Sequence, residues 1–279
     1  MTKRCLCILL AALTLLCLGG CDRKALTTPP ADVLAAAQAP ETPTAVPETE
    51  PPTEAPTETE PPTEPPTEPP TEPPLVLHSG LREDGSFNEG TLFIGDSLTF
   101  QMIYGYLQPK NYAGDAKYIS ICGSQITAFF DGTKITCSAA STLASPEFDG
   151  MLFHEAAASM GEDATAIYIM WGTNFTKDAT YETYVEILDY LLEHCPNATI
   201  HLQTVPYAKD VVPYQLINER ILDAYAYYQE VGQERVLLLD SFTGIGRSIS
   251  GDGVHLADSG KVRWYETILA HADQLELPE

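Results

Sequence analysis

The sequence is poor in basic residues. It has 15 Lys and Arg against 39 Asp and Glu in 279 residues, which gives a formal net charge of −24. It contains no basic patch or stripe of the kind that binds nucleic acid, and a surface of this charge repels anionic polymers. The composition therefore indicates that nucleic acid is not a partner, and solubility is the simplest role of the acidic excess.

The sequence also lacks an apolar run of about 20 residues, the length that a membrane-spanning helix needs. The apolar run over residues 5–18 is shorter and follows Lys3 and Arg4, which is typical of a signal peptide. It ends in Leu-Gly-Gly-Cys at Cys21, a sequence that resembles the bacterial lipobox. We therefore predict a signal peptide over 1–20, a lipid on Cys21, a lipid-anchored segment over 21–39 and an extracytoplasmic, membrane-anchored protein. An ordinary secretory peptide is the alternative.

Cysteines at metal-binding spacing are absent as well. Beyond Cys21 the chain has Cys122, Cys137 and Cys195, with no CxxC pair. A disulfide between Cys122 and Cys137 and three buried thiols are both compatible with this pattern. The stretch FHEAAASM around His154 is not the HExxH motif of zinc enzymes, so we predict no metal site.

Large apolar residues are almost absent from residues 40–74, where the tetrapeptide TEPP occurs five times. Such a segment cannot build a core, and its prolines favour an extended polyproline II chain. At about 3.1 Å per residue, its roughly 35 residues reach on the order of 100 Å. We predict a disordered stalk that carries a globular domain over residues 75–279.

Beyond residue 75, short apolar runs alternate with amphipathic helical patterns. The apolar runs cover 91–95, 117–121, 166–171, 199–205 and 235–240, and the helical patterns cover 181–194, 214–231 and 258–275. This alternation is typical of a parallel sheet covered by helices on both faces. We predict one α/β domain with five parallel strands, and a site beyond the carboxyl ends of those strands.

The residues that follow the predicted strands supply the groups of an acyl-transfer site. They are Gly95-Asp96-Ser97, Gly123, Gly172-Thr173-Asn174, Asp252 and His255. A serine hydroxyl needs a base to become a nucleophile, and His255 can be that base if Asp252 orients it. The N–H groups of Ser97 and Gly123 and the side-chain amide of Asn174 can stabilise an oxyanion.

Each of these residues has a simpler explanation when it is considered alone. Asp96 or Ser97 can cap a helix, Asn174 can cap a turn, and Asp252-Gly253 is a common turn dipeptide. Their joint occurrence at strand ends favours the catalytic interpretation. Within it, we expect Asp96 to support the turn rather than the chemistry.

GDSLT at 95–99, Gly123, GTN at 172–174 and DGVH at 252–255 resemble, in this order, the four sequence blocks of the SGNH (GDSL) hydrolase family. The resemblance extends from about residue 91 to residue 269. It implies a flavodoxin-like three-layer α/β/α sandwich and a site without a cofactor. It also implies a nucleophile at Ser97, a base at His255 oriented by Asp252, and an oxyanion hole made by Ser97, Gly123 and Asn174.

The sequence departs from the family pattern at two places. The second block is reduced to a single glycine, so Gly114 competes with Gly123 for its role. The third block often ends in Asp, where this chain has Phe175, and this change alters the wall of the pocket.

Together these features predict a monomeric serine esterase that removes small acyl groups, above all O-acetyl groups, from carbohydrate or peptidoglycan. A lipase or lysophospholipase, or an O-acyltransferase, would use the same residues. A surface lipoprotein that binds without catalysis is a further alternative, which the complete catalytic set disfavours. Four aromatic residues near strand ends could form a sugar platform, although such residues more often belong to the core: Phe130, Trp171, Tyr207 and Tyr214.

Overall fold

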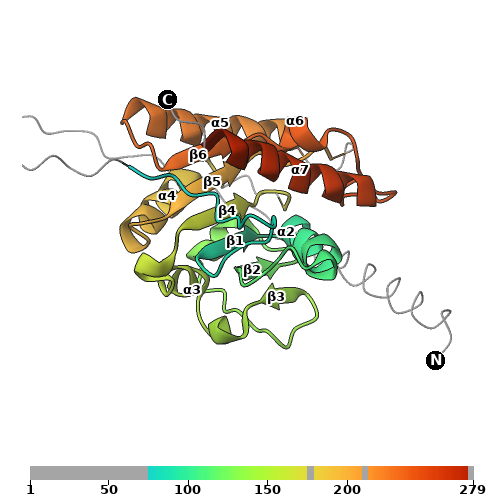
Figure 1. The fold of residues 1–279 in the computed structure, drawn as a ribbon, viewed down its shortest axis with the longest axis horizontal. Helices are drawn as coiled ribbons and strands as arrows, with labels where there is room; N and C mark the ends of the chain where they lie inside the picture. Colours follow the sequence, from blue (N-terminus) through green and yellow to red (C-terminus); the bar gives the residue numbers. More distant parts are fainter. Residues whose placement is uncertain (1–74, 175–178, 209–212, 276–279) are drawn as a thin grey trace, which may run out of the picture. The chain divides into compact units, whose positions relative to one another are not determined.

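A central β-sheet with helices on both faces makes up the folded part of the chain (Figure 1). The computed structural model describes residues 75–174, 179–208 and 213–275. The predicted signal peptide, the lipid attachment at Cys21 and the stalk lie outside the described residues, as does Phe175.

The sheet has six strands among the described residues, in the order β3-β2-β1-β4-β5-β6. They are β1 (Thr91–Gly95), β2 (Lys117–Ile121), β3 (Thr142–Ala144), β4 (Ala166–Met170), β5 (Thr199–Gln203) and β6 (Val236–Leu239). All neighbours pair in parallel except β2 and β3, which are antiparallel. The five predicted parallel strands are therefore confirmed, and the count of five is wrong by one. The missed strand, β3, lies at an edge and is too short to carry a recognisable alternation of polar and apolar residues.

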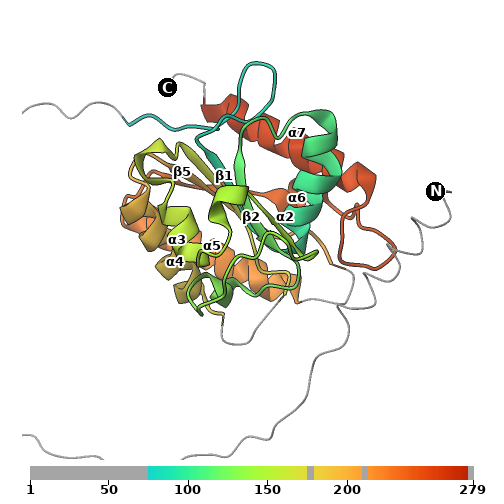
Figure 2. The same ribbon diagram turned by 90° about the horizontal axis from the view of Figure 1, so that it is seen from below.

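The helices form a layer on each face of the sheet, as Figure 2 shows. On one face lie α2 (Ser97–Met102), α6 (Ser241–Ile245) and α7 (Asp258–Leu275). On the other lie α3 (Phe153–Ala158), α4 (Tyr181–His194) and α5 (Tyr214–Glu230). The predicted three-layer α/β/α sandwich is confirmed.

Alternate side chains of each central strand enter different cores. Leu92 and Ile94 of β1 belong to the core under α3, α4 and α5, while Phe93 belongs to the core under α2 and α7. Its ring stacks on Tyr168 of β4, with ring centroids 5.1 Å apart. Because both faces are covered, every residue of β1, β4 and β5 is buried. This explains why β1 and β4 are almost wholly apolar, whereas β5 also buries Thr199, His201 and Gln203.

The strand order reverses between β1 and β4. From β1 the chain proceeds to β2 on one side, and β4 is followed by β5 and β6 on the other. In open α/β sheets, ligands bind at such a reversal, beyond the carboxyl ends of the strands. Ser97 follows β1 and Asn174 follows β4, so both lie at this point.

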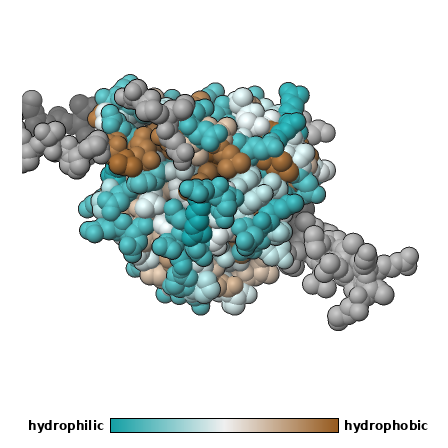
Figure 3. Space-filling view, in the orientation of Figure 1, coloured by the Kyte–Doolittle hydropathy of each residue, from teal (hydrophilic) through white to brown (hydrophobic). Residues whose placement is uncertain are grey.

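The surface is mostly polar on the face drawn in Figure 3, where hydrophobic side chains gather in a band across the upper part. Single apolar side chains such as Tyr104 and Val231 are more than half exposed. Among the described residues, none of the helices combines the length and the apolar character that crossing a bilayer requires.

Candidate active site

Ser97 is the first residue of α2 and lies just past the end of β1. The turn requires a glycine at Gly95, because a Cβ there would lie 2.1 Å from Thr99 Oγ1 and 2.3 Å from the main-chain oxygen of Met170. Asp96 caps the helix, since its Oδ1 accepts a hydrogen bond of 3.0 Å from the N–H of Leu98. Asp96 thus supports the turn, as the sequence predicts, and Ser97 is held at the sheet edge.

Asp96 also ties together three strand ends. Its side chain is fully buried, and its Oδ2 accepts hydrogen bonds from the N–H groups of Thr173 (2.9 Å) and Gly172 (3.4 Å), which follow β4. Its main-chain oxygen accepts a hydrogen bond of 2.7 Å from Ser120 Oγ in β2. Burial raises the pKa of Asp96, and the backbone donors oppose that rise. The turn that carries Ser97, strand β2 and the loop of Asn174 are therefore fixed relative to one another.

Ser97, His255 and Asp252 form one hydrogen-bonded chain. His255 Nε2 lies 3.1 Å from Ser97 Oγ, and His255 Nδ1 lies 2.7 Å from Asp252 Oδ2. The other carboxylate oxygen of Asp252 accepts hydrogen bonds from Ser250 Oγ (2.6 Å) and from the N–H groups of Val254 and His255 (3.0 Å each). The structure therefore brings together residues that are 158 positions apart in the sequence.

The charge of Asp252 selects the tautomer of the neutral imidazole. Partial burial alone would raise the pKa of Asp252, but the hydrogen bonds from Ser250, Val254 and His255 outweigh it and hold the pKa well below its usual value. An ionised Asp252 only accepts, so the proton of neutral His255 resides on Nδ1. Nε2 then presents a lone pair to Ser97 Oγ and can take its proton.

Three potential oxyanion donors surround the serine turn. The N–H groups of Ser97 and Gly123 make no hydrogen bond to any other described residue. Asn174 Nδ2 donates to the main-chain oxygen of Ser124 (3.1 Å), which leaves its second N–H for a ligand. Gly123 follows β2 and has a positive φ of 82°, whereas Gly114 precedes β2 and so lies at the opposite end of that strand.

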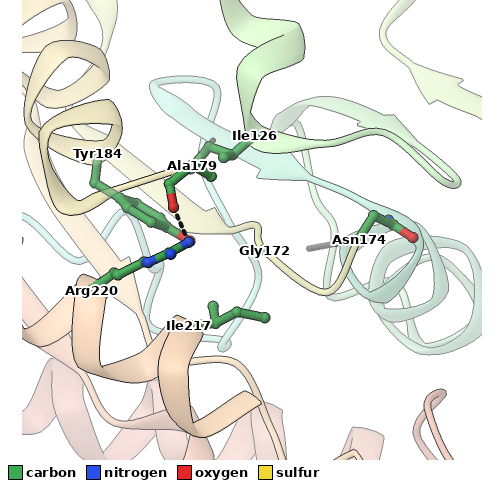
Figure 4. A pocket seen from close by; sticks show the side chains of 7 residues that line it. All are labelled: Ile126, Gly172, Asn174, Ala179, Tyr184, Ile217 and Arg220. Carbon is green, nitrogen blue, oxygen red and sulfur yellow. Dashed lines mark hydrogen bonds between the residues drawn. The ribbon is translucent and has the colours of Figure 1, made fainter. Parts of the chain in front are cut away.

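A small cavity lies beside Asn174 (Figure 4). Its volume is about 10 Å³, and it is lined by Ile126, Gly172, Asn174, Ala179, Tyr184, Ile217 and Arg220. In Figure 4, Asn174 extends away from the cluster of Tyr184, Ala179 and Arg220. A cavity of this size holds at most one water molecule, and neither Ser97 nor His255 is among the residues that line it.

The sequence analysis did not identify Ser120, Ser124 or Ser250. Of these, only Ser250 had a local signal, because a serine two residues before an Asp-Gly turn can donate to the aspartate. The roles of Ser120 and Ser124 depend on contacts between segments that follow different strands. A single sequence carries no pattern for such contacts.

The four aromatic residues near strand ends divide into two kinds. Trp171 is 1% exposed and belongs to the core, and Phe130 packs against Tyr190 on the helical layer. Tyr207 and Tyr214 are both half-buried at the carboxyl edge of the sheet, with ring centroids 5.0 Å apart.

Other candidate groups lie outside this site. The Cys137 thiol is free and packs against the carbonyls of Ala144 and Ser145, so Cys137 forms no disulfide with Cys122. His271 on α7 is half-buried, with its Nε2 3.1 Å from His201 Nδ1. In residues 75–174, 179–208 and 213–275, no three His, Cys, Asp or Glu side chains are grouped to hold a metal ion.

Comparison with known proteins gives similarity to solved structures only. No protein-family model and no curated protein matches the sequence. A family 3 carbohydrate esterase from Talaromyces cellulolyticus is 12% identical over 66% of this chain and 96% of its own (TM-score 0.45). A family 2 carbohydrate esterase from Clostridium thermocellum is 15% identical over 66% and 63% (TM-score 0.46). The catalytic domain of peptidoglycan O-acetyltransferase A from Streptococcus pneumoniae is 17% identical over 66% and 92% (TM-score 0.41). Similarity at this level leaves the function to be inferred from the geometry of the site.

Proposed function

We propose that this protein is a serine esterase of the SGNH type that hydrolyses acyl esters through Ser97. The observation that carries the proposal is the hydrogen-bonded chain from Ser97 Oγ through His255 to Asp252, with distances of 3.1 and 2.7 Å. Distances in this range allow proton transfer between a nucleophile and its base. A binding protein would have no use for a serine hydroxyl aimed at an imidazole that an ionised carboxylate orients.

The proposed reaction has two steps. Ser97 Oγ attacks the acyl carbonyl carbon while His255 Nε2 takes the serine proton. The N–H groups of Ser97 and Gly123 and the amide of Asn174 donate to the oxyanion of the tetrahedral intermediate. His255 then protonates the leaving alcohol, which yields an acyl-enzyme. A water molecule then attacks the acyl-enzyme while His255 takes its proton. The bond to Ser97 Oγ breaks as His255 gives that proton to the serine oxygen, which releases the acid.

We propose a small acyl group, above all acetyl, on carbohydrate or peptidoglycan. The signal-peptide pattern and Cys21 support a membrane-anchored, extracytoplasmic protein. In that location polymeric glycans are more accessible than cytoplasmic metabolites.

The test compares hydrolysis of p-nitrophenyl acetate and p-nitrophenyl octanoate by the full chain and its Ser97→Ala variant. We expect turnover that favours acetate and that falls by a factor of at least about 10³ in Ser97→Ala. Ser159→Ala is the matched control, since Ser159 Oγ only donates to a carbonyl of α3 and should leave the rate unchanged. A preference for octanoate would replace the short-acyl proposal with a lipase. Equal rates for wild type and Ser97→Ala would refute the esterase and favour a binding protein.

A further inference from the structure

A cluster of aromatic rings and one arginine lies at the carboxyl ends of β5 and β6. Tyr207 follows β5, Tyr214 begins α5, and Phe242 lies in α6. The centroid of the Tyr214 ring lies 5.0 Å from that of Tyr207 and 5.6 Å from that of Phe242, on which it stacks. The guanidinium carbon of Arg247 lies 5.0 Å from the centroid of the Tyr207 ring. Three segments that follow neighbouring strands therefore meet in one half-buried cluster.

Arg247 has no acidic partner in the described part of the chain. It is exposed. A second arginine is close by, since Arg263 Nη1 lies 3.7 Å from the position a Cβ would take at Gly246. Within the described part of the chain Arg263 also lacks an acidic partner; its guanidinium donates to the main-chain oxygen of Ile245. Two guanidinium groups without an acidic partner among the described residues therefore lie near Gly246, in a chain of net charge −24.

The cluster adjoins the segment that carries the catalytic histidine. Ile249 pairs with Leu256, the residue after His255, and the N–H of Ser250 donates to the main-chain oxygen of His255 (2.6 Å). Two residues span at most about 7 Å, so the backbone of Arg247 lies within about 7 Å of Ile249. The N–H of Ile249 also donates to the main-chain oxygen of Arg247 (2.9 Å), so the loop that holds His255 is continuous with the turn that carries Arg247.

We propose that Arg247 and the Tyr207 ring form a subsite for the carboxylate of an acidic sugar, in a glycan whose acyl group is cleaved at Ser97. This inference rests on the proposed function and narrows its substrate to acylated anionic glycans. The guanidinium fork matches a carboxylate through two parallel N–H donors. The Tyr207 ring holds the guanidinium through a cation–π contact and adds apolar surface against which a sugar ring can pack.

The kinetic test uses the full chain and three acetyl esters: acetylated oligogalacturonates, acetylated cello-oligosaccharides and p-nitrophenyl acetate. For Arg247→Gln we expect kcat/KM on the acidic oligosaccharide to fall about tenfold, mainly through KM. Its rates on the neutral oligosaccharide and on p-nitrophenyl acetate should stay within about twofold of wild type. Lys110→Gln removes the same charge from an exposed residue before β2 and should leave all three rates unchanged.

A binding measurement keeps the subsite separate from the chemistry. Calorimetry with non-acetylated oligogalacturonate compares Ser97→Ala with the double variant Ser97→Ala/Arg247→Gln, and we expect the double variant to bind about tenfold more weakly. Absence of esterase activity together with this difference would refute the proposed function and leave the subsite standing. Equal affinity of the two proteins would overturn the subsite. So would an equal loss for Arg247→Gln on acidic and neutral oligosaccharides, which would indicate a subsite for neutral sugar.

Discussion

Acidification from pH 7 to pH 5 should destabilise the folded domain by about 2 kcal/mol through one side chain, His201 of β5. Its ring is fully buried and stacks on Tyr168, with centroids 4.3 Å apart. His201 Nε2 donates to the main-chain oxygen of His78 (2.9 Å), so Nδ1 accepts from His271 Nε2 (3.1 Å). A second proton on His201 would sit on Nδ1 and would be directed at the N–H of His271, which is itself a donor. Burial first, and then the neighbouring His271, lower the pKa of His201 to about 3.

The sign of the effect follows from the two pKa values. In the unfolded chain His201 has its ordinary pKa of about 6.5, so between pH 6.5 and pH 3 the unfolded state binds a proton that the folded state does not. The free energy of unfolding therefore falls as the pH falls below about 6.5, and it goes on falling until the pH reaches about 3. With these two pKa values, proton binding lowers the free energy of unfolding by about 0.2 kcal/mol at pH 7 and by about 2 kcal/mol at pH 5, relative to a pH well above 6.5.

Urea denaturation of wild type and His201→Phe at both pH values measures this contribution. Phe keeps the stacking on Tyr168 but removes the titrating group and leaves the donor of His271 without its acceptor. We therefore expect His201→Phe to have a lower free energy of unfolding than wild type at pH 7. Between pH 7 and pH 5, its free energy of unfolding should decrease by about 2 kcal/mol less than that of wild type. His194→Phe, at the end of α4, is the matched control and should keep the wild-type loss. Equal losses in wild type and His201→Phe would refute the reasoning.

Three other predictions, the last of which compares two glycine variants, concern the site and its supporting turns. Asp252→Asn should lower kcat on p-nitrophenyl acetate by about 10⁴, because the amide donates to His255 Nδ1 and selects the wrong tautomer. Asn174→Ala should lower kcat by about 10² to 10³ with little change in KM, since an oxyanion donor acts in the transition state. Gly95→Ala should reduce the free energy of unfolding in urea by about 3 kcal/mol, because its Cβ would overlap Thr99 Oγ1 and the Met170 carbonyl. Gly123→Ala, with a φ of 82° but no atom within 4 Å of the added Cβ, should cost only about 1 kcal/mol.

Distinct results would contradict each of these predictions. An Asp252→Asn variant with wild-type kcat would show that Asp252 does not orient His255 for proton transfer. An Asn174→Ala variant that raised KM alone would make Asn174 a ground-state binding group. Equal destabilisation by Gly95→Ala and Gly123→Ala would mean that steric overlap does not explain the glycine at Gly95.

The sequence predicts most of the sheet because its central strands are buried on both faces. β1 and β2 have the bounds expected from their apolar runs, as do helices α4 and α7. β3 was missed because its three residues are half-buried at an edge, where packing does not impose an apolar pattern. The π-helix over Ile103–Leu107 was also not predicted, since its residues have the same composition as an α-helical turn.

The contact between Ser97 and His255 was predictable from the topology. Ser97 follows a parallel strand and His255 precedes the last helix, and sites in such sheets form where these connections meet, beyond the carboxyl ends of the strands. The supporting groups were not predictable in this way. Asp96 has the signature of a helix cap, but its bonds to Gly172 and Thr173 depend on how closely two loops approach. The position of Arg247 over Tyr207 likewise depends on the approach of two loops, and neither residue has a local pattern that marks the pairing.

The separation of 158 positions between Ser97 and His255 has a consequence for synthesis of the chain. A ribosome makes the serine turn and β4 well before the loop that carries Asp252 and His255, and domains complete their folding only when their last elements are available. A chain that ends before Asp252 holds the serine without its base, and it also lacks α7, which covers one face of the sheet. Proposed esterase activity is therefore a property of the finished domain, and interrupted translation products or fragments trimmed from the C-terminal side carry none of it.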